Sequence, residues 1–151
     1  EQDCPELVSQ LLADEVDSLI LVPNCPVCHQ SLALAARAAE KAGLLTVIMG
    51  CAKDIVERVG VPRFYFSDFP LGNSCGRPDD RLSQEQMLND ALYMLETAIA
   101  PRTTVTNLLK WQGVKNWKDD YANIEKLSDA EIAQRRADFD AAKAVLKNER
   151  V

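Results

Sequence analysis

Three short apolar runs, alternating with helix signals, constrain the fold of this chain more than any other feature. The runs are residues 18–22, 45–49 and 63–67. Each has the length and apolar character of a strand buried on both faces of a sheet. An alanine- and leucine-rich segment, 26–42, ends before Gly43, and a shorter helical segment, 54–59, ends before Gly60. This order predicts an α/β fold, a three-layer sandwich with a short parallel β-sheet (a βαβαβ core) and right-handed crossovers.

Two capping boxes predict two further helices. Ser83 with Gln86 begins the first, and Ser128 with Glu131 begins a charged helix near the end of the chain. Between them, residues 103–123 hold both tryptophans and show no regular pattern.

The final helix carries a narrow apolar stripe. Ile132, Phe139 and Leu146 lie seven residues apart, which suits a helix lying on a surface and not one buried in a core. We therefore divide the chain into an α/β thiol-site domain, 1–102, and an extended and helical tail, 103–151, that packs on the domain or on a partner.

The charge balance excludes some classes of protein. With a net charge of −6, the chain lacks the clustered Lys and Arg that a nucleic-acid surface needs. No apolar run approaches the roughly 20 residues of a membrane span, and no signal peptide is visible. The chain starts at Glu1, which suits a processed or trimmed piece of a longer protein. Five cysteines, an odd number, suit reduced thiols in a cytoplasmic protein better than a disulfide scaffold.

Four of the five cysteines fall where strands end. Cys25 and Cys28 follow the first strand, Cys51 follows the second, and Cys75 lies in the loop after the third. Open α/β folds bind ligands at the carboxyl ends of their strands. We therefore expect these four sheet-edge cysteines to converge, while Cys4 belongs to another helix and is a bystander.

The stretch CPVCH places two thiols at the start of a helix. Pro26 suits the first helical position, so Cys25 is the N-cap and Cys28 lies in the first turn. The helix dipole lowers the pKa of such thiols. His29 could add charge or relay a proton. Cysteine is often only a small buried hydrophobe, but a CxxC motif that opens a helix favours chemistry.

Other chemistries share this spacing. CPVCH matches the haem-c attachment pattern, although the axial ligand would have to be Met49, Met87 or Met94. The sheet-edge cysteines could hold zinc, but the second pair lacks knuckle spacing. A thioredoxin-like dithiol needs an antiparallel hairpin and a cis-proline, which residues 61–81 do not offer. Because the haem and zinc patterns are both incomplete, we predict no metal.

Longer stretches carry a family resemblance. NCPVCHQSLALAARAAEKAG, LLTVIMG and FSDFPLGNSCGRP resemble the C-terminal part of the substrate-reducing selenoproteins of the glycine, sarcosine and betaine reductases and of D-proline reductase. In that family a cysteine, two residues and a selenocysteine (or cysteine) open the helix, and a Pro-Leu-Gly-Asn or similar loop follows the third strand. Cys25 falls on the family's cysteine, Cys28 on its selenocysteine position, and residues 70–73 on the loop. The resemblance covers about residues 17–76.

The resemblance implies a thiol-dependent reductase subunit. Cys28 would be the attacking thiolate and Cys25 the resolving thiol, acting on a small amino acid or amine-like substrate. A dithiol electron donor protein would restore both thiols. The chain itself would carry no cofactor, a pyruvoyl group would belong to a partner subunit, and a hetero- or homo-oligomer is expected. Sulfur in place of selenium departs from the best-known members and leaves the substrate class open.

The loop after the third strand is the second candidate site element. Gly72 and Gly76 permit an anion-binding nest, where Asn73 would donate to a substrate carboxylate, with Arg77 at the rim. We include Gly72, Asn73, Cys75 and Cys51 among the substrate-binding residues. A plain tight turn also explains this composition.

Two other functions stay open. One is a thioredoxin-like thiol redox carrier without a small substrate. The other is a non-catalytic subunit of a complex that uses the tail helix to hold a partner.

Overall fold

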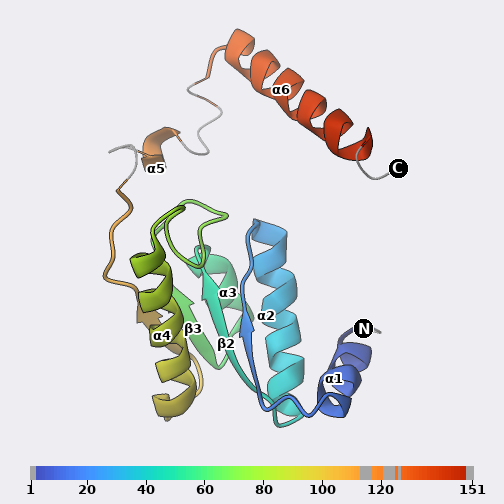
Figure 1. The fold of residues 1–151 in the computed structure, drawn as a ribbon, viewed down its shortest axis with the longest axis vertical. Coiled ribbons are helices and arrows are strands. Elements are labelled where there is room, and N and C mark those ends of the chain that lie inside the picture. The colour runs from blue at the N-terminus through green and yellow to red at the C-terminus, as the bar shows by residue number, and fades with distance from the viewer. Residues whose placement is uncertain (1–2, 113–116, 121–124, 126, 149–151) are drawn as a thin grey trace. The chain divides into compact units, whose positions relative to one another are not determined.

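The computed structural model describes residues 3–112, 117–120, 125 and 127–148. They belong to two compact units, Glu1–Gln112 and Gly113–Val151, each of which is described by itself. In Figure 1 the first unit contains the sheet and its helices, and the described part of the second contains two helices.

The first unit alternates helices and strands along the chain. Its elements are α1 (Asp3–Ala13), β1 (Ser18–Leu21), α2 (Pro26–Lys41), β2 (Leu45–Gly50), α3 (Lys53–Val59), β3 (Arg63–Phe66), α4 (Arg81–Thr97) and β4 (Thr103–Thr106). The four strands are all parallel and lie in the order β1-β2-β3-β4. The predicted α/β fold with a short parallel sheet is confirmed.

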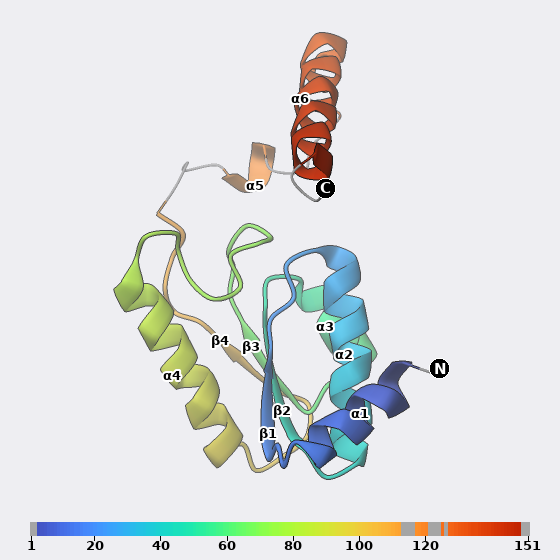
Figure 2. The same cartoon turned by 45° about the vertical axis from the view of Figure 1, so that its right-hand side comes forward.

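Helices cover both faces of the sheet. Figures 1 and 2 show α2 and α3 on one face and α4 on the other. Side chains alternate along β2, so Val47 and Met49 pack with Tyr65 on the α4 side, while Ile48 packs with Phe64 on the side of α2 and α3. The two separate cores make the three layers that the sequence predicts.

A fourth strand lies where the sequence analysis expects irregular chain. Residues 103–106 form β4, which is held by hydrogen bonds from Thr103 N to Pro62 O (3.0 Å) and from Asn107 N to Phe66 O (2.8 Å). The prediction of irregular structure from residue 103 onward is therefore wrong for these residues. Thr-Thr-Val-Thr is short and polar, so an edge strand here lacks the apolar run that marks β1 to β3. Because β4 belongs to the sheet, the first unit extends to Gln112, beyond the predicted boundary after residue 102.

Several predicted helix ends agree with the structure, and one differs. Gly43, with φ of 93°, follows the cap of α2 as predicted. The capping box of Ser128 and Glu131 is present, with Ser128 N donating to Glu131 Oε2 (2.8 Å) and Glu131 N to Ser128 Oγ (3.3 Å). The predicted Ser83 cap is wrong, because Asp80 is the N-cap of α4 and its Oδ1 accepts from Ser83 N (3.1 Å).

The second unit contains α5 (Trp117–Asp120) and α6 (Asp129–Asn148). On α6, Ile132 and Phe139 are exposed, while the side chain of Leu146 lies outside the described residues. Among the helices described in either unit, none combines the length and apolar character that crossing a membrane requires.

Candidate functional site

The CxxC pair begins α2 as predicted. Cys25 is the N-cap in extended conformation (φ −114°, ψ 164°), Pro26 is the first helical residue, and Cys28 lies in the first turn. The Sγ of Cys25 accepts a hydrogen bond from Cys28 N at 3.2 Å. Cys25 is exposed and Cys28 is partly buried. Cys25 is therefore the more exposed residue of the pair, and a backbone N–H is placed to stabilise its sulfur as a thiolate.

The two sulfurs form a disulfide, with Cα atoms 5.0 Å apart. This differs from the expectation that every cysteine is a reduced thiol. Cys4, Cys51 and Cys75 are free thiols. The CxxC pair is therefore placed to close a disulfide.

His29 is completely buried directly after the pair. Its Nδ1 lies 2.7 Å from Cys25 O, and its Nε2 accepts from Cys51 N (3.0 Å) and Ala52 N (3.2 Å). Because a backbone N–H can only donate and a carbonyl can only accept, Nε2 is unprotonated and Nδ1 carries the proton. Both ring nitrogens are thus bonded to backbone groups, which leaves neither available to relay a proton in this arrangement.

Gly50, the last residue of β2, makes room for this ring. A Cβ at this position would lie 2.9 Å from both Cδ2 and Nε2 of His29 and 3.2 Å from Cε2 of Phe64. Real Cβ atoms essentially never lie within 3.0 Å of such neighbours, so the packing of His29 favours glycine here.

Cys51 lies in the turn after β2 and contacts the loop after β3. Its Sγ is 3.6 Å from Ser74 Oγ, and Ser74 Oγ donates to Pro23 O at 2.6 Å. Burial raises the pKa of the Cys51 thiol, and a negative charge on Cys75 would raise it further. Loss of solvation also raises the pKa of the Cys75 thiol, although the residue as a whole is exposed. These two thiols therefore form a thiolate less readily than an ordinary cysteine does.

The loop after β3 adopts a tight turn. Gly72 and Gly76 have φ of 93° and 125°, conformations that favour glycine. Asn73 donates to Pro70 O through both its side-chain Nδ2 (3.0 Å) and its backbone N (3.2 Å). These bonds support the plain-turn interpretation, while the carboxylate nest stays a prediction.

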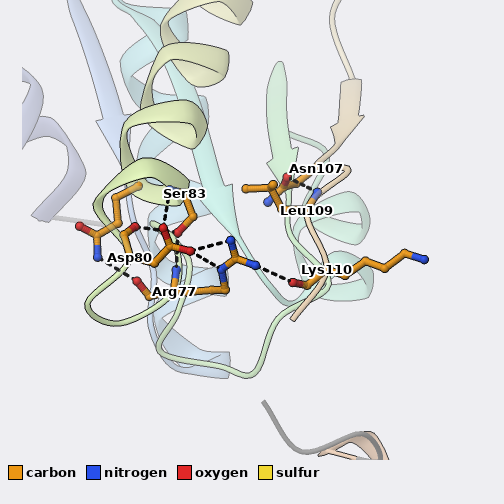
Figure 3. A network of polar contacts seen from close by, with 7 residues as sticks. Arg77, Asp80, Ser83, Asn107, Leu109 and Lys110 are labelled. Carbon is orange, nitrogen blue, oxygen red and sulfur yellow. Dashed lines mark hydrogen bonds and ion pairs between the residues drawn. The ribbon is translucent and has the colours of Figure 1, made fainter. Parts of the chain in front are cut away.

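Arg77 holds the loop after β3 in place through hydrogen bonds. Its Nε donates to Asp80 Oδ2 (2.7 Å) and its Nη1 to Lys110 O (3.1 Å), as Figure 3 shows. The Ser83 N–H, and after it the Arg77 guanidinium, hold the pKa of the Asp80 carboxyl below its usual value. The guanidinium predicted at the rim of a substrate site thus ties the loop to the segment after β4. This network could not be predicted from the sequence, because Lys110 contributes only a carbonyl, which no side-chain pattern reveals.

A groove opens beside the first turn of α2. It has a volume of about 370 Å³ and is lined by Pro26, Val27, Gln30, Asp54, Ile55, Arg58 and Val59. The sequence analysis missed it, because it forms only where α2 and α3 lie side by side. Among the described residues, no group of three or more His, Cys, Asp or Glu side chains is arranged to hold a metal ion.

Comparison with known proteins gives one informative similarity. The chain is 30% identical over 95 residues to D-proline reductase subunit gamma of Acetoanaerobium sticklandii. The match is partial. It covers 63% of this chain and 39% of that protein, so the chain spans about two fifths of the length of the relative. No protein-family model and no solved structure matches the chain.

Proposed function

We propose that this chain is a thiol-dependent reductase subunit of the glycine and D-proline reductase type. The observation that carries the proposal is the Cys25–Cys28 pair, which opens α2 at the carboxyl edge of a parallel sheet and can close a disulfide. The partial similarity to a D-proline reductase subunit supports the same role.

In the proposed reaction the reduced pair supplies two electrons to a carbon–nitrogen bond. The Cys28 thiolate attacks the carbon, a C–S bond forms as the C–N bond breaks, and the nitrogen leaves with a proton. The Cys25 thiolate then attacks Cys28 Sγ and forms the disulfide. The electron pair of the C–S bond passes to the carbon, which takes a proton and leaves as the reduced product.

Partners complete the proposed cycle. A dithiol protein reduces the disulfide, and the substrate is a small amino acid or amine-like molecule. Its carboxylate would lie at the loop near Gly72 and Asn73, with Cys51 and Cys75 beside it. A partner subunit would supply a pyruvoyl group to activate the amine, and no step assigned to this chain runs through that group. We further propose that the protein works in the cytoplasm as part of a hetero- or homo-oligomer.

A second function has its own support. Cys25 is exposed and its Sγ accepts a hydrogen bond from Cys28 N, which is the arrangement expected of a first attacking thiol. If Cys25 attacks first, the pair suits exchange with another protein's disulfide. That would make the chain a thiol redox carrier. All four described strands are parallel, so such a carrier would lack the antiparallel hairpin of the thioredoxin fold.

Turnover by the assembled complex separates the two functions. The chain is purified with its native partners and supplied with a dithiol, and D-proline, glycine and betaine are tested as substrates. We expect one substrate to be reduced by the wild type and by the matched control Cys4→Ser, but not by Cys28→Ser. Reduction of a protein disulfide with no turnover of any small substrate would favour the carrier. Copurification of a pyruvoyl-bearing chain would further support the reductase.

A further inference from the structure

The contacts of His29 suggest a role different from proton transfer. We propose that His29 is a positioning residue, a neutral imidazole protonated at Nδ1 that holds the turn carrying Cys51 against the first turn of α2. The inference deepens the proposed function of the same site and rests on that function only where turnover is measured.

The hydrogen-bond partners of the ring fix its state. Nε2 faces two donors, Cys51 N and Ala52 N, and Nδ1 faces one acceptor, Cys25 O. A second proton would place an N–H against two N–H groups. Ala52 is the N-cap of α3 and makes no side-chain capping bond. The imidazole accepts from the N–H of this N-cap residue, the bond that a Glu or Gln at N3 makes in a capping box and that Ile55, at N3 of α3, cannot make.

The ring is one link in a closed circuit of contacts. From Cys25 O the circuit runs through His29 to the backbone of Cys51, and Cys51 Sγ then contacts Ser74 Oγ. Ser74, which is 1% exposed, donates to Pro23 O, two residues before Cys25 in the chain. The circuit joins the starts of α2 and α3 to the loop after β3, so His29 fixes the CxxC pair relative to the other site elements.

The first test reads the tautomer directly. Because the chain has a single histidine, two-bond ¹H–¹⁵N correlation spectra of the intact protein report on His29 alone. We expect a protonated Nδ1 and an unprotonated Nε2 at neutral pH. A ring protonated at Nε2, or at both nitrogens, would overturn the proposal.

The second test compares two substitutions. His29→Gln keeps an acceptor near the position of Nε2 but cannot relay a proton, whereas His29→Phe removes the acceptor. We expect turnover to stay close to wild type in His29→Gln and to fall about 100-fold in His29→Phe, because misplaced reacting groups cost that much. Alkylation of Cys51 should also be faster in His29→Phe, with Cys4 unchanged as the internal control.

The outcomes are distinguishable. Equal loss of turnover in both variants, with Cys51 alkylation unchanged, would favour proton relay and contradict the positioning role. If His29→Phe does not fold, the tautomer of His29 and the turnover of His29→Gln relative to wild type still test the positioning role. If the wild type reduces no small substrate, the proposed function fails, while the tautomer and the alkylation of Cys51 still test His29.

Discussion

Replacing Gly50 by alanine should destabilise the protein and loosen its thiol site together. The added Cβ would lie 2.9 Å from two atoms of the buried His29 ring and 3.2 Å from Phe64. His29 has no space to yield, because it is completely buried and bonded at both nitrogens. The ring must therefore shift and lengthen its bonds to Cys51 N and Ala52 N.

The magnitude follows from three contributions. Forcing a methyl group into a packed core costs about 1–3 kcal/mol. The two weakened hydrogen bonds cost about 1 kcal/mol each. Alanine also restricts the unfolded chain, which offsets about 0.4–1 kcal/mol. The free energy of unfolding should therefore fall by about 2–5 kcal/mol.

Urea denaturation of the oxidised protein measures this loss, with Gly43→Ala as the control. Gly43 lies at the opposite end of β2, in the connection from α2, and a Cβ there meets nothing within 4 Å. Its substitution should cost only the left-handed backbone strain, about 1–2 kcal/mol, and should leave the alkylation of Cys51 unchanged. The reasoning is refuted if Gly50→Ala is no less stable than Gly43→Ala and alkylates Cys51 at the wild-type rate.

Three further predictions concern the thiols, metals and a buried tyrosine. In the reduced protein, iodoacetamide should label Cys25 or Cys28 well below pH 8.5 and Cys51 only at higher pH. The reason is that the helix N-terminus favours thiolates, while burial raises the pKa of Cys51. Equal labelling rates at the three cysteines would contradict this prediction. The purified protein should be colourless, without a Soret band, and should hold less than one zinc per chain by elemental analysis; one tightly held zinc would make the sheet-edge cysteines ligands. Burial, and then Asp90, raise the pKa of Tyr65, so the folded protein keeps a proton that the unfolded chain releases near pH 10. The free energy of unfolding should therefore decline above about pH 10, and it should decline less in Tyr65→Phe. Urea denaturation from pH 8 to 11 measures both.

The frame of the fold was predictable because its signals are local. The apolar runs of β1 to β3 and the glycine after α2 each act within a few residues, and the N-cap position of Cys25 follows from Pro26. Strand β4 lacked such a signal, because polar β-branched residues at a sheet edge are compatible with both a strand and a loop. The start of α4 was misplaced because Ser83 and Asp80 are both good caps, and the structure uses the earlier one.

The candidate site was predictable only as a set of positions. Parallel topology places the carboxyl ends of the strands on one edge, which brought Cys25, Cys28, Cys51 and Cys75 into one prediction. What each polar group contacts could not be predicted, because the partners are backbone atoms distant in the chain. His29 is bonded to the backbone of Cys51, and Arg77 to a carbonyl 33 residues away, so neither side chain is free in the way the sequence analysis expected.

Trapping the covalent intermediate tests the central claim most directly. The reduced complex is prepared with Cys25→Ser or with Cys28→Ser, mixed with D-proline, quenched and mapped by peptide mass spectrometry. The account predicts an adduct on Cys28 in the Cys25→Ser protein, no adduct in the Cys28→Ser protein, and no steady-state turnover in either, because a hydroxyl cannot form the disulfide that releases the product. An adduct on Cys25 in the Cys28→Ser protein would reverse the two roles. Adducts in neither variant, with a wild-type disulfide that still exchanges with a dithiol protein, would contradict the reductase and leave the redox carrier.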